Sequence, residues 1–392
     1  MTSDRPAGPQ ADSAPAQPEV PAAERTYRAL DLINTDKSAK ELLDRRVALV
    51  NETGRYRNDI YCTQGEYVDR LRAAGHTVHV VDTPRGLSPL GLLASTWRTF
   101  RLLRRCRFDV IHTHGSVIGL IGRTAALFAR TPVVIHQVHG FHHHDGMKAP
   151  ARWIFVWAER LMSALTEKLL FQNEADVQEC LRRRIAPQGK LVLVGNGIEM
   201  DRFHPGEPPQ NDPPVILYVG RFEPVKNHAM ILETARLLRD RGVSFVLKLA
   251  GEGELLSECQ DWVRRHDLGD RVEFLGYRDD IPQLTAQSEV CVLVSLKEGI
   301  PRAIIEAAAC GRPIVASDVV GNRDAVVDGA TGFLVPLDHA EAMADRIQEL
   351  LADGELRERI GRQARAHAVE HFDERRVTQR IVEVYDRALA GR

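Results

Sequence analysis

Short apolar runs alternate with longer amphipathic segments along most of this chain. The runs span about five residues and are rich in Val, Ile and Leu, which is typical of strands buried on both faces of a parallel sheet. The segments between them repeat apolar residues at helical spacing. The pattern therefore predicts repeated strand–helix units, the organisation of an α/β protein.

The alternation falls into two halves separated by a proline-rich break. This break covers 199–214 and holds five prolines together with Gly, Asn and Asp, a composition typical of a linker. Because ligands bind beyond the carboxyl ends of the strands in open parallel sheets, we expect a deep cleft between two Rossmann-like domains. The predicted strands are 46–50, 77–81, 108–112, 132–137, 167–172 and 190–194 before the break, and 215–219, 245–250, 271–275, 290–294, 313–316 and 332–335 after it.

The length of 392 residues and the 44% hydrophobic content also favour two cores rather than one. Residues 1–28 precede the alternation and are rich in Pro and Ala, so we predict a disordered tail there. We assign the first domain to 29–200 and the second to 201–372. The remaining segment, 373–392, contains a final predicted helix at 374–389.

Charge and cysteine usage exclude several classes of protein. The formal net charge is −2, which argues against a nucleic-acid partner. The six cysteines are scattered and form no C-x-x-C pair, so neither a zinc site nor a disulfide framework is indicated, and a reducing cytoplasm fits best. No apolar run reaches the roughly 18–20 residues of a spanning helix, and the N-terminus lacks the apolar core of a signal peptide.

The strongest chemical signal is the segment E-G-I-P-R-A-I-I-E at 298–306, between a predicted strand and an apolar helix. Pro301 suits the first helical turn, and the backbone amides from Gly299 onward are placed to bind a diphosphate at a positive helix end. Glu298 and Glu306 can accept hydrogen bonds from sugar hydroxyls. The alternative is two solvated surface acids, but the helix is otherwise apolar.

The second signal is G-R-F-E-P-V-K-N at 220–227, directly after the first strand of the second half. Arg221 and Lys226 flank a tight turn that begins at Gly220, and two cations there can bind a diphosphate and stabilise the charge that develops as it leaves. A pair of surface bases near Glu223 is the alternative and would be preferred if this segment stood alone.

Taken together, these motifs resemble family 4 glycosyltransferases of the GT-B fold. The two segments above, A-G-E-G at 250–253, G-R-P-I-V-A-S-D at 311–318 and G-A-T-G-F-L-V at 329–335 occur in the order typical of that family. The stretch H-G-F-H-H-H at 139–144 is similar to members that build bacterial surface polysaccharides. The resemblance covers most of the chain beyond the N-terminal tail.

The resemblance implies a role for each matching residue of the second domain, which would bind the nucleotide sugar. Arg221 and Lys226 would contact the donor diphosphate, and Glu306 would bind the ribose. Glu298 would hold the transferred sugar. The other implied donor-binding residues are Gly220, Gly251, Gly276, Tyr277, Arg278, Gly299, Ile300 and Pro301.

The first domain would bind the acceptor, and the last helix would cross back onto it. His139, after the strand 132–137, would lie close to the transferred sugar, and His112 and His114 also match the family. Many relatives carry a double-glycine loop after the first strand. The corresponding stretch here is taken as 51–58, where Gly54 is the one glycine assigned to donor binding, so Arg55 or Arg57 is expected to supply charge instead of amides.

No metal is expected at this site. A histidine-rich stretch, His139 with 142–145, has no known zinc spacing, and no D-x-D follows a strand to hold a cation on a diphosphate. Backbone amides, Arg221 and Lys226 can replace that cation. Two amphipathic stretches, 87–107 and 153–171, are best interpreted as core-facing helices; docking on an anionic membrane is the alternative if the acceptor is a lipid.

The sequence thus predicts a retaining, metal-independent glycosyltransferase without a bound cofactor. Its donor would be a nucleoside-diphosphate sugar, with UDP preferred because uracil is the commonest base among relatives. Its acceptor would be a lipid-linked glycan or a small metabolite, in the cytoplasm or at the inner membrane face. The catalytic residues would be His139, Arg221, Lys226 and Glu298. A nucleotide-sugar epimerase, a hydrolase and a non-catalytic nucleotide-sugar-binding relative are the alternatives.

Overall fold

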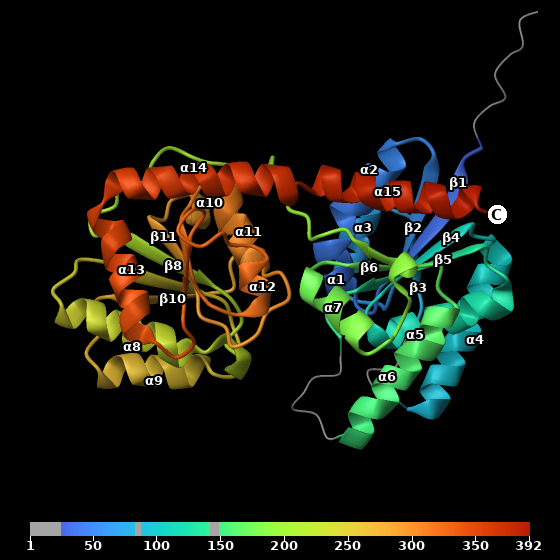
Figure 1. The fold of residues 1–392 in the computed structure, drawn as a ribbon, viewed down its shortest axis with the longest axis horizontal. Helices are drawn as coiled ribbons and strands as arrows, with labels where there is room; N and C mark the ends of the chain where they lie inside the picture. Colours follow the sequence, from blue (N-terminus) through green and yellow to red (C-terminus); the bar gives the residue numbers. More distant parts are fainter. Residues whose placement is uncertain (1–24, 83–87, 142–148) are drawn as a thin grey trace, which may run out of the picture.

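The computed structural model describes residues 25–82, 88–141 and 149–392, arranged as two α/β domains along the long axis of the molecule (Figure 1). Each domain is a parallel sheet covered by helices. Most of the predicted tail, residues 1–24, lies outside the described residues. The remainder of that prediction is wrong, because Tyr27 and Arg28 belong to the first strand.

The sheet of the first domain has the strand order β3-β2-β1-β4-β5-β6-β7, with every pairing parallel. The order reverses between β1 and β4, and in such sheets the crevice beside the reversal is where ligands bind. The strands are β1 (Tyr27–Leu32), β2 (Tyr56–Cys62), β3 (Val78–Val80), β4 (Val110–His114), β5 (Val133–Val138), β6 (Lys168–Phe171) and β7 (Leu191–Leu193). The helices are α1 (Asp36–Leu42), α2 (Asp44–Glu52), α3 (Tyr67–Ala73), α4 (Pro89–Cys106), α5 (Ser116–Ala129), α6 (Ala149–Ala164) and α7 (Glu174–Arg182).

The beginning of this domain differs from the sequence prediction. Residues 46–50, predicted as a strand, lie within helix α2, where Val47 and Val50 are fully buried, as is the N-cap residue Leu43. A short apolar run fits one face of a helix as well as a strand, so the pattern alone could not distinguish them. Cys62 ends strand β2, and helix α3 begins at Tyr67.

Strand β2 was missed because its sequence, Y-R-N-D-I-Y-C, is too polar for a central strand. Two of its polar side chains are buried and paired. Asn58 donates to the Asp31 carboxylate at 2.6 Å, and Asp59 lies 3.4 Å from the Arg28 guanidinium. Buried polar groups are stable when they find such partners, but the partners come from a strand far away in the sequence.

The sheet of the second domain has the order β10-β9-β8-β11-β12-β13, also parallel throughout. All six predicted strands are confirmed to within one residue. They are β8 (Val215–Val219), β9 (Val246–Ala250), β10 (Val272–Gly276), β11 (Val290–Leu293), β12 (Ile314–Ser317) and β13 (Phe333–Val335). The helices are α8 (His228–Asp240), α9 (Leu256–Arg265), α10 (Ile281–Ala286), α11 (Arg302–Ala309), α12 (Val320–Arg323), α13 (Ala340–Ala352) and α14 (Gly354–His371).

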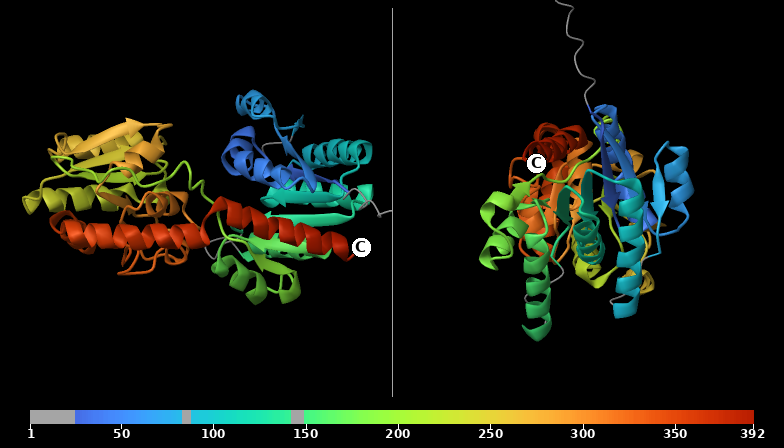
Figure 2. Two further views of the ribbon diagram at one scale, coloured as in Figure 1. Left: turned by 90° about the horizontal axis from the view of Figure 1, so that it is seen from above. Right: turned by 90° about the vertical axis from the view of Figure 1, so that its right-hand side faces the viewer.

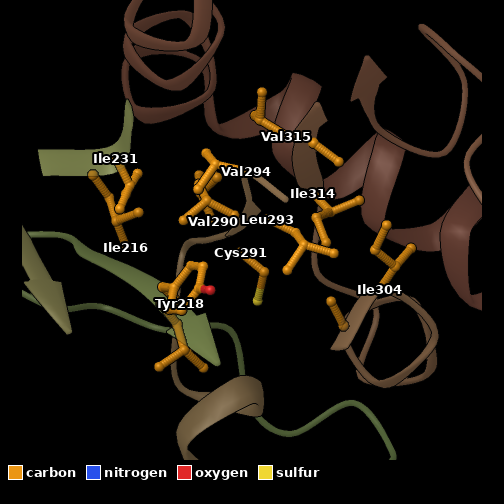
Figure 3. Close-up of a cluster of buried hydrophobic side chains, with 14 of the residues drawn as sticks. Ile216, Tyr218, Ile231, Val290, Cys291, Leu293, Val294, Ile304, Ile314 and Val315 are labelled. Atoms are coloured by element: carbon orange, nitrogen blue, oxygen red, sulfur yellow. The ribbon is translucent and has the colours of Figure 1, made fainter. Parts of the chain in front are cut away.

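The prediction succeeded here because these strands are almost wholly apolar. Figure 3 shows Ile216, Val290, Leu293 and Ile314 from three neighbouring strands packed with Ile304 of helix α11. All of these side chains are buried. Close packing of this kind holds the strand ends, and the loops that follow them, in fixed positions.

The C-terminal helix α15 (Glu374–Ala390) leaves the second domain and packs on the first. It continues almost in line with α14 above both domains (Figures 1 and 2). Its buried face, which includes Val377, Ile381 and Tyr385, joins a cluster with Ala29 and Val110 of the first sheet. The predicted crossing of the last helix is therefore confirmed, whereas the domain limits at 200 and 372 stay predictions.

Candidate active site

The segments that follow the strands of the two sheets meet between the domains. The Lys37 ammonium at the start of α1 lies 5.6 Å from the ring centre of Tyr277, which follows β10. The Asn196 amide donates to the Ile300 carbonyl at 3.4 Å. The carboxyl ends of both sheets thus face a common region, as the alternating pattern predicts for a two-domain cleft.

Lys226 and Glu298 form the electrostatic centre of the second-domain side. Lys226 ends the short helix η2 (Pro224–Lys226) after β8, and Glu298 lies in the loop after β11. The Lys226 Nζ is 2.5 Å from Glu298 Oε1, and the two side chains are only 18% and 12% exposed. The Leu296 amide also donates to the Val225 carbonyl at 2.8 Å, so the two loops are joined by backbone as well.

Arg221, by contrast, is an exposed side chain. It is 75% accessible and pairs with Glu223 at 2.6 Å, the arrangement that the sequence offered as the alternative to diphosphate binding. Exposed pairs of this kind contribute roughly 0–1 kcal/mol, so an arriving diphosphate can displace Glu223 at little cost. The role of Arg221 stays a prediction. An open hollow of about 500 Å³ adjoins this turn and is lined by Glu223, Pro224, Val225, Gly253 and Glu254.

Glycine backbones bring the loops of this domain into close contact. Gly251 has φ +146°, and a Cβ there would lie 2.0 Å from the Gly220 carbonyl oxygen. A Cβ on Gly321 would lie 1.4 Å from the carbonyl oxygen of Gly299. Sequence reasoning selected Gly220, Gly251 and Gly299 but missed Gly321, since only the tertiary structure brings it against the 298–301 loop.

Helix α11 carries the predicted diphosphate and ribose contacts. Pro301 is its N-cap residue, with the neighbouring Ile300 buried. Glu306 is 12% exposed and lies 3.4 Å from Arg302 on the same helix. Burial raises the pKa of the Glu306 carboxyl, and the charge of Arg302 opposes that rise. A largely buried carboxyl in this position can accept hydrogen bonds from hydroxyl groups.

The loop after β10 holds the residues predicted to border the base. Gly276 ends the strand with φ +64°, which places the next residue toward the first domain. Tyr277 is 54% exposed, and Arg278 donates to Asp280 at 2.7 Å. The exposed Tyr277 ring is suited to stack on a base.

On the first-domain side, His139 follows β5 and joins a buried polar cluster. Its Nε2 lies 3.0 Å from Nδ1 of His114, and Nε2 of His114 lies 2.7 Å from Asp31 Oδ1. Arg46 of α2 bonds to Asp31 and, at 3.1 Å, to the Gln137 amide oxygen. Asp31 and Arg46 were missed in the sequence because β1 was not recognised and 46–50 was taken for a strand.

The position of Gly54 contradicts its predicted role. Gly54 lies in the turn between α2 and β2, at the amino end of β2 and therefore at the edge of the sheet opposite the cleft. Arg55 pairs there with Asp386 of α15 at 2.8 Å, so it does not supply charge to a donor site. The loop that follows the first strand is 33–35, which leads into α1 with Thr35 as N-cap. The error follows directly from the wrong first strand.

The His and Asp groups of the first domain do not fit a metal ion. Potential ligand atoms of Asp31, His112 and His114 lie within 4.8 Å of one another. However, the Arg46 guanidinium bonds to Asp31 and lies 3.0 Å from His114 Nε2, so a cation already occupies the space between them. Residues 142–145 of the histidine-rich stretch lie outside the described residues.

Two parallel-sheet domains whose strand-end loops face each other, with a C-terminal helix that crosses between them, define the GT-B fold. Two family models match the chain: "Glycosyl transferase 4-like domain" over residues 44–197 and "Glycosyl transferases group 1" over residues 199–367. The chain therefore belongs to the group 1 glycosyltransferases of the family 4 type, and it is a glycosyltransferase as the motifs predict.

Individual relatives agree with this assignment. An alpha-D-kanosaminyltransferase of Streptomyces kanamyceticus is 35% identical over 75% of this chain and 84% of its own length. The UDP-Gal:alpha-D-GlcNAc-diphosphoundecaprenol alpha-1,3-galactosyltransferase of Escherichia coli is 28% identical over 74% of this chain and 78% of its own. The structure of Anabaena HepE in complex with UDP and glucose superposes with a TM-score of 0.77 at 20% identity, covering 92% of this chain and 99% of that one.

Proposed function

We propose that this glycosyltransferase moves a hexose or amino sugar from a UDP-sugar to a hydroxyl of a lipid-linked glycan, with retention of configuration and without a metal. A small-molecule acceptor is the second option. The observation that carries the proposal is the largely buried Lys226–Glu298 pair beside the start of α11. The Escherichia coli relative uses a UDP-sugar and a diphosphoundecaprenol acceptor by its name, and HepE was solved with UDP and glucose.

In this proposal the second domain holds the donor. Arg221 and Lys226 bind the diphosphate, Glu298 and the backbone of 299–301 hold the sugar and distal phosphate, and Glu306 binds the ribose. Lys226 already lies next to Glu298, so one loop contact joins the phosphate-binding and sugar-binding groups. Fixed cations aimed at a leaving diphosphate lower the barrier because their charge needs no reorganisation during the reaction.

The buried state of Asp31 supports a same-face displacement rather than a covalent intermediate. A retaining double displacement needs a carboxylate nucleophile near the anomeric carbon. Asp31, the carboxylate linked to His139 through His114, is fully buried and bonded to Arg46, His114 and Asn58. It is therefore not free to attack. The departing phosphate would take the proton of the acceptor hydroxyl on the same face of the sugar.

The test of donor and metal requirement is thermal-shift binding with UDP, GDP, ADP, TDP and CDP, each in EDTA and in magnesium. We expect UDP to stabilise the protein more than the others, equally with and without magnesium, since a ligand of the native state raises the unfolding temperature. Stabilisation that requires magnesium would contradict metal independence. Stabilisation by none of the nucleotides would favour a non-catalytic relative, and conversion of a UDP-sugar without acceptor would favour an epimerase.

A lipid-linked acceptor requires contact with a membrane, and one surface of the first domain suits it. Helices α4 and α6 project from the same side of that domain (Figures 1 and 2). Their exposed large apolar side chains are Leu90, Leu93, Trp97, Trp153, Ile154, Trp157 and Leu161. Exposed arginines of α4, among them Arg98, Arg101 and Arg105, lie on the same helix pair. No helix in the described ranges combines the length and apolarity needed to cross a membrane. Aromatic side chains beside arginines fit the surface of an anionic bilayer.

We expect the full-length protein to float with phosphatidylglycerol vesicles and not with phosphatidylcholine vesicles. The double variant Trp153→Ser/Trp157→Ser should lose flotation while still transferring sugar to a water-soluble acceptor analogue. Phe128→Ser is the matched control, because Phe128 is an equally exposed aromatic on another helix, α5. Unchanged flotation of the double variant would remove this surface from the proposal and leave the small-molecule acceptor preferred.

A further inference from the structure

A continuous chain of hydrogen bonds runs from the interior of the first domain to His139. Asp31 of β1 and His114 of β4 are buried, and 2.7 Å separates Asp31 Oδ1 from His114 Nε2. The next step, from His114 Nδ1 to His139 Nε2, is 3.0 Å. Neighbouring parallel strands β1, β4 and β5 supply the three residues at the same edge of the sheet.

The chemistry of Asp31 fixes where the hydrogens lie. The Arg46 guanidinium, which can only donate, lies 3.0 Å from His114 Nε2, but an Asp31 carboxylate oxygen, which only accepts, lies closer at 2.7 Å. Because two acceptors would repel each other at 2.7 Å, the geometry favours a hydrogen on Nε2 that His114 donates to Asp31. His114 Nδ1 is then an acceptor, and the hydrogen between the two rings must belong to His139 Nε2. Burial, together with the charge of Arg46, keeps the pKa of His114 well below its usual value, so the ring is neutral and has one hydrogen to place.

The groups around Asp31 prevent this arrangement from rotating. Asn58 donates to Asp31 Oδ2 at 2.6 Å, and Arg46 bonds to Oδ1 while also reaching Gln137. His112 Nδ1 lies 3.4 Å from Asp31 Oδ1 but bonds at 2.7 Å to the Tyr385 hydroxyl of α15. Side chains from three elements, α2, β2 and β4, therefore surround the carboxylate, and His114 is its link toward the cleft.

We propose that Asp31 and His114 are positioning residues that fix the ring orientation and tautomer of His139, so that Nδ1 of His139 acts as a hydrogen-bond acceptor in the cleft. The inference rests on the proposed function, because it takes His139 as the first-domain group that meets the transferred sugar. Burial lowers the pKa of the His139 ring to about 4, so this ring is neutral as well. Because Nδ1 of His139 carries no hydrogen in this tautomer, it can accept a hydrogen bond from a sugar hydroxyl. It cannot donate one to a phosphate oxygen.

Two substitutions of His114 remove, one at a time, its contact with Asp31 and its contact with His139. His114→Gln places an amide where Nε2 was, keeping the contact with Asp31 and losing the acceptor for His139. His114→Asn places an amide where Nδ1 was, keeping that acceptor and losing the contact with Asp31. His112→Asn is the matched control, since His112 is an equally buried imidazole on the same strand that keeps its Tyr385 contact through the amide and does not touch His139.

We expect His114→Gln to lower kcat by about 10-fold to 100-fold, the size associated with a misplaced catalytic group, while the Kd for UDP and the unfolding temperature stay near those of the His112→Asn control. His114→Asn should lose less activity than His114→Gln. Equal activity of His114→Gln and the His112→Asn control would overturn the proposal. Loss of UDP binding in His114→Gln would show a structural role only and would overturn it as well.

A second measurement does not depend on activity. Nitrogen chemical shifts of ¹⁵N-histidine-labelled protein, with His139 assigned from the His139→Gln spectrum, report which ring nitrogen carries hydrogen. We expect hydrogen on Nε2 of His139 in the native protein and a mixture of tautomers in His114→Gln. Hydrogen on Nδ1 of His139 in the native protein would overturn the inference even if the transferase is active. Full activity of His139→Gln would instead count against the proposed function, with the tautomer result still standing on its own.

Discussion

Lys226 and Glu298 show how a pair of residues far apart in the sequence becomes a chemical unit. They are 72 positions apart, yet their charged atoms are 2.5 Å apart with most of both side chains removed from water. Each neutralises the other in the free enzyme. In the proposed function, the donor diphosphate would give Lys226 a second anionic partner without moving it, and such a pre-set position is what electrostatic catalysis requires.

Lys226→Ala tests this directly. We expect kcat/KM for sugar transfer to fall by about 10²-fold to 10³-fold, the loss typical of removing one fixed donor to a developing charge. Lys248→Ala is the control, because Lys248 lies within β9 and makes only a 4.0 Å contact with Glu273. Turnover of Lys226→Ala close to that of Lys248→Ala would remove Lys226 from the mechanism.

Gly321 is the second residue whose effect can be predicted. A Cβ there would meet the Gly299 carbonyl oxygen at 1.4 Å, so Gly321→Ala must displace the 298–301 loop or α12. We expect weaker UDP-sugar binding, measured by calorimetry, with only a modest change in unfolding temperature. Gly269→Ala, where nothing lies within 4 Å of the new Cβ, should bind as the native protein does. Equal affinities for the two variants would show that this loop does not hold the donor.

Among the elements, helix α15 links the two domains. Its first residue, Glu374, packs against Gly197 where the chain crosses between domains, and the Ile198 and Asp373 backbones pair there. Burial, with the charge of Glu199, raises the pKa of Glu374 to about 7. A helix N-terminus favours a carboxylate by roughly 0.3–1 kcal/mol, which is too little to outweigh that burial.

The raised pKa predicts a pH-dependent stability. The carboxyl of an exposed glutamate has a pKa of 4.5, so folding takes up a proton between that pH and about 7. The stabilising contribution is complete below the unfolded value and is lost as the pH rises through the folded one. Glu374→Gln should therefore be more stable than the native protein at pH 8, by about 1–3 kcal/mol, with the difference shrinking toward pH 5.

Urea unfolding of both proteins across this pH range measures the effect. Glu383→Gln is the matched control, since Glu383 is an exposed residue of the same helix that pairs with Arg387 at 3.4 Å. If the native protein is as stable at pH 8 as Glu374→Gln, then burial of the Glu374 carboxylate does not destabilise the folded protein.

For the whole molecule, the buried histidines of the first domain set the response to acid. Burial lowers the pKa of His112, His114 and His136 well below 6.5. Unfolding exposes these rings, so below about pH 6.5 the unfolded chain binds protons that the folded protein does not bind. Stability is therefore complete above about pH 6.5 and falls as the pH drops below it.

We expect the unfolding temperature to decrease between pH 6.5 and pH 5, in the direction opposite to the Glu374 effect. The measurement is cleanest in the Glu374→Gln background, where the opposing proton uptake is absent. His136→Asn, which can keep the 2.8 Å bond to Thr113, should give a shallower decrease than its parent. A flat profile, or an equally steep one in His136→Asn, would contradict neutral burial of these rings.

The sequence by itself determined the second domain, its six strands and the motifs of the donor side. Those strands are apolar throughout, and the groups of each motif are close along the chain, so local pattern was sufficient. It also indicated His139, because that residue directly follows a clear apolar strand. Only the tertiary structure identified β1, β2 and α2. These elements place Gly54 at the edge of the sheet opposite the strand-end loops.

The same difference applies to the buried network behind His139. Asp31, Arg46, Asn58 and His114 lie on four elements, and each is polar at a position where pattern reasoning expects an apolar residue. A buried charge is stable only with a partner, and the partners here are brought together by the order of strands in the sheet. Hydrophobic periodicity records which face of an element is buried, but it does not record which distant polar groups will meet on that face.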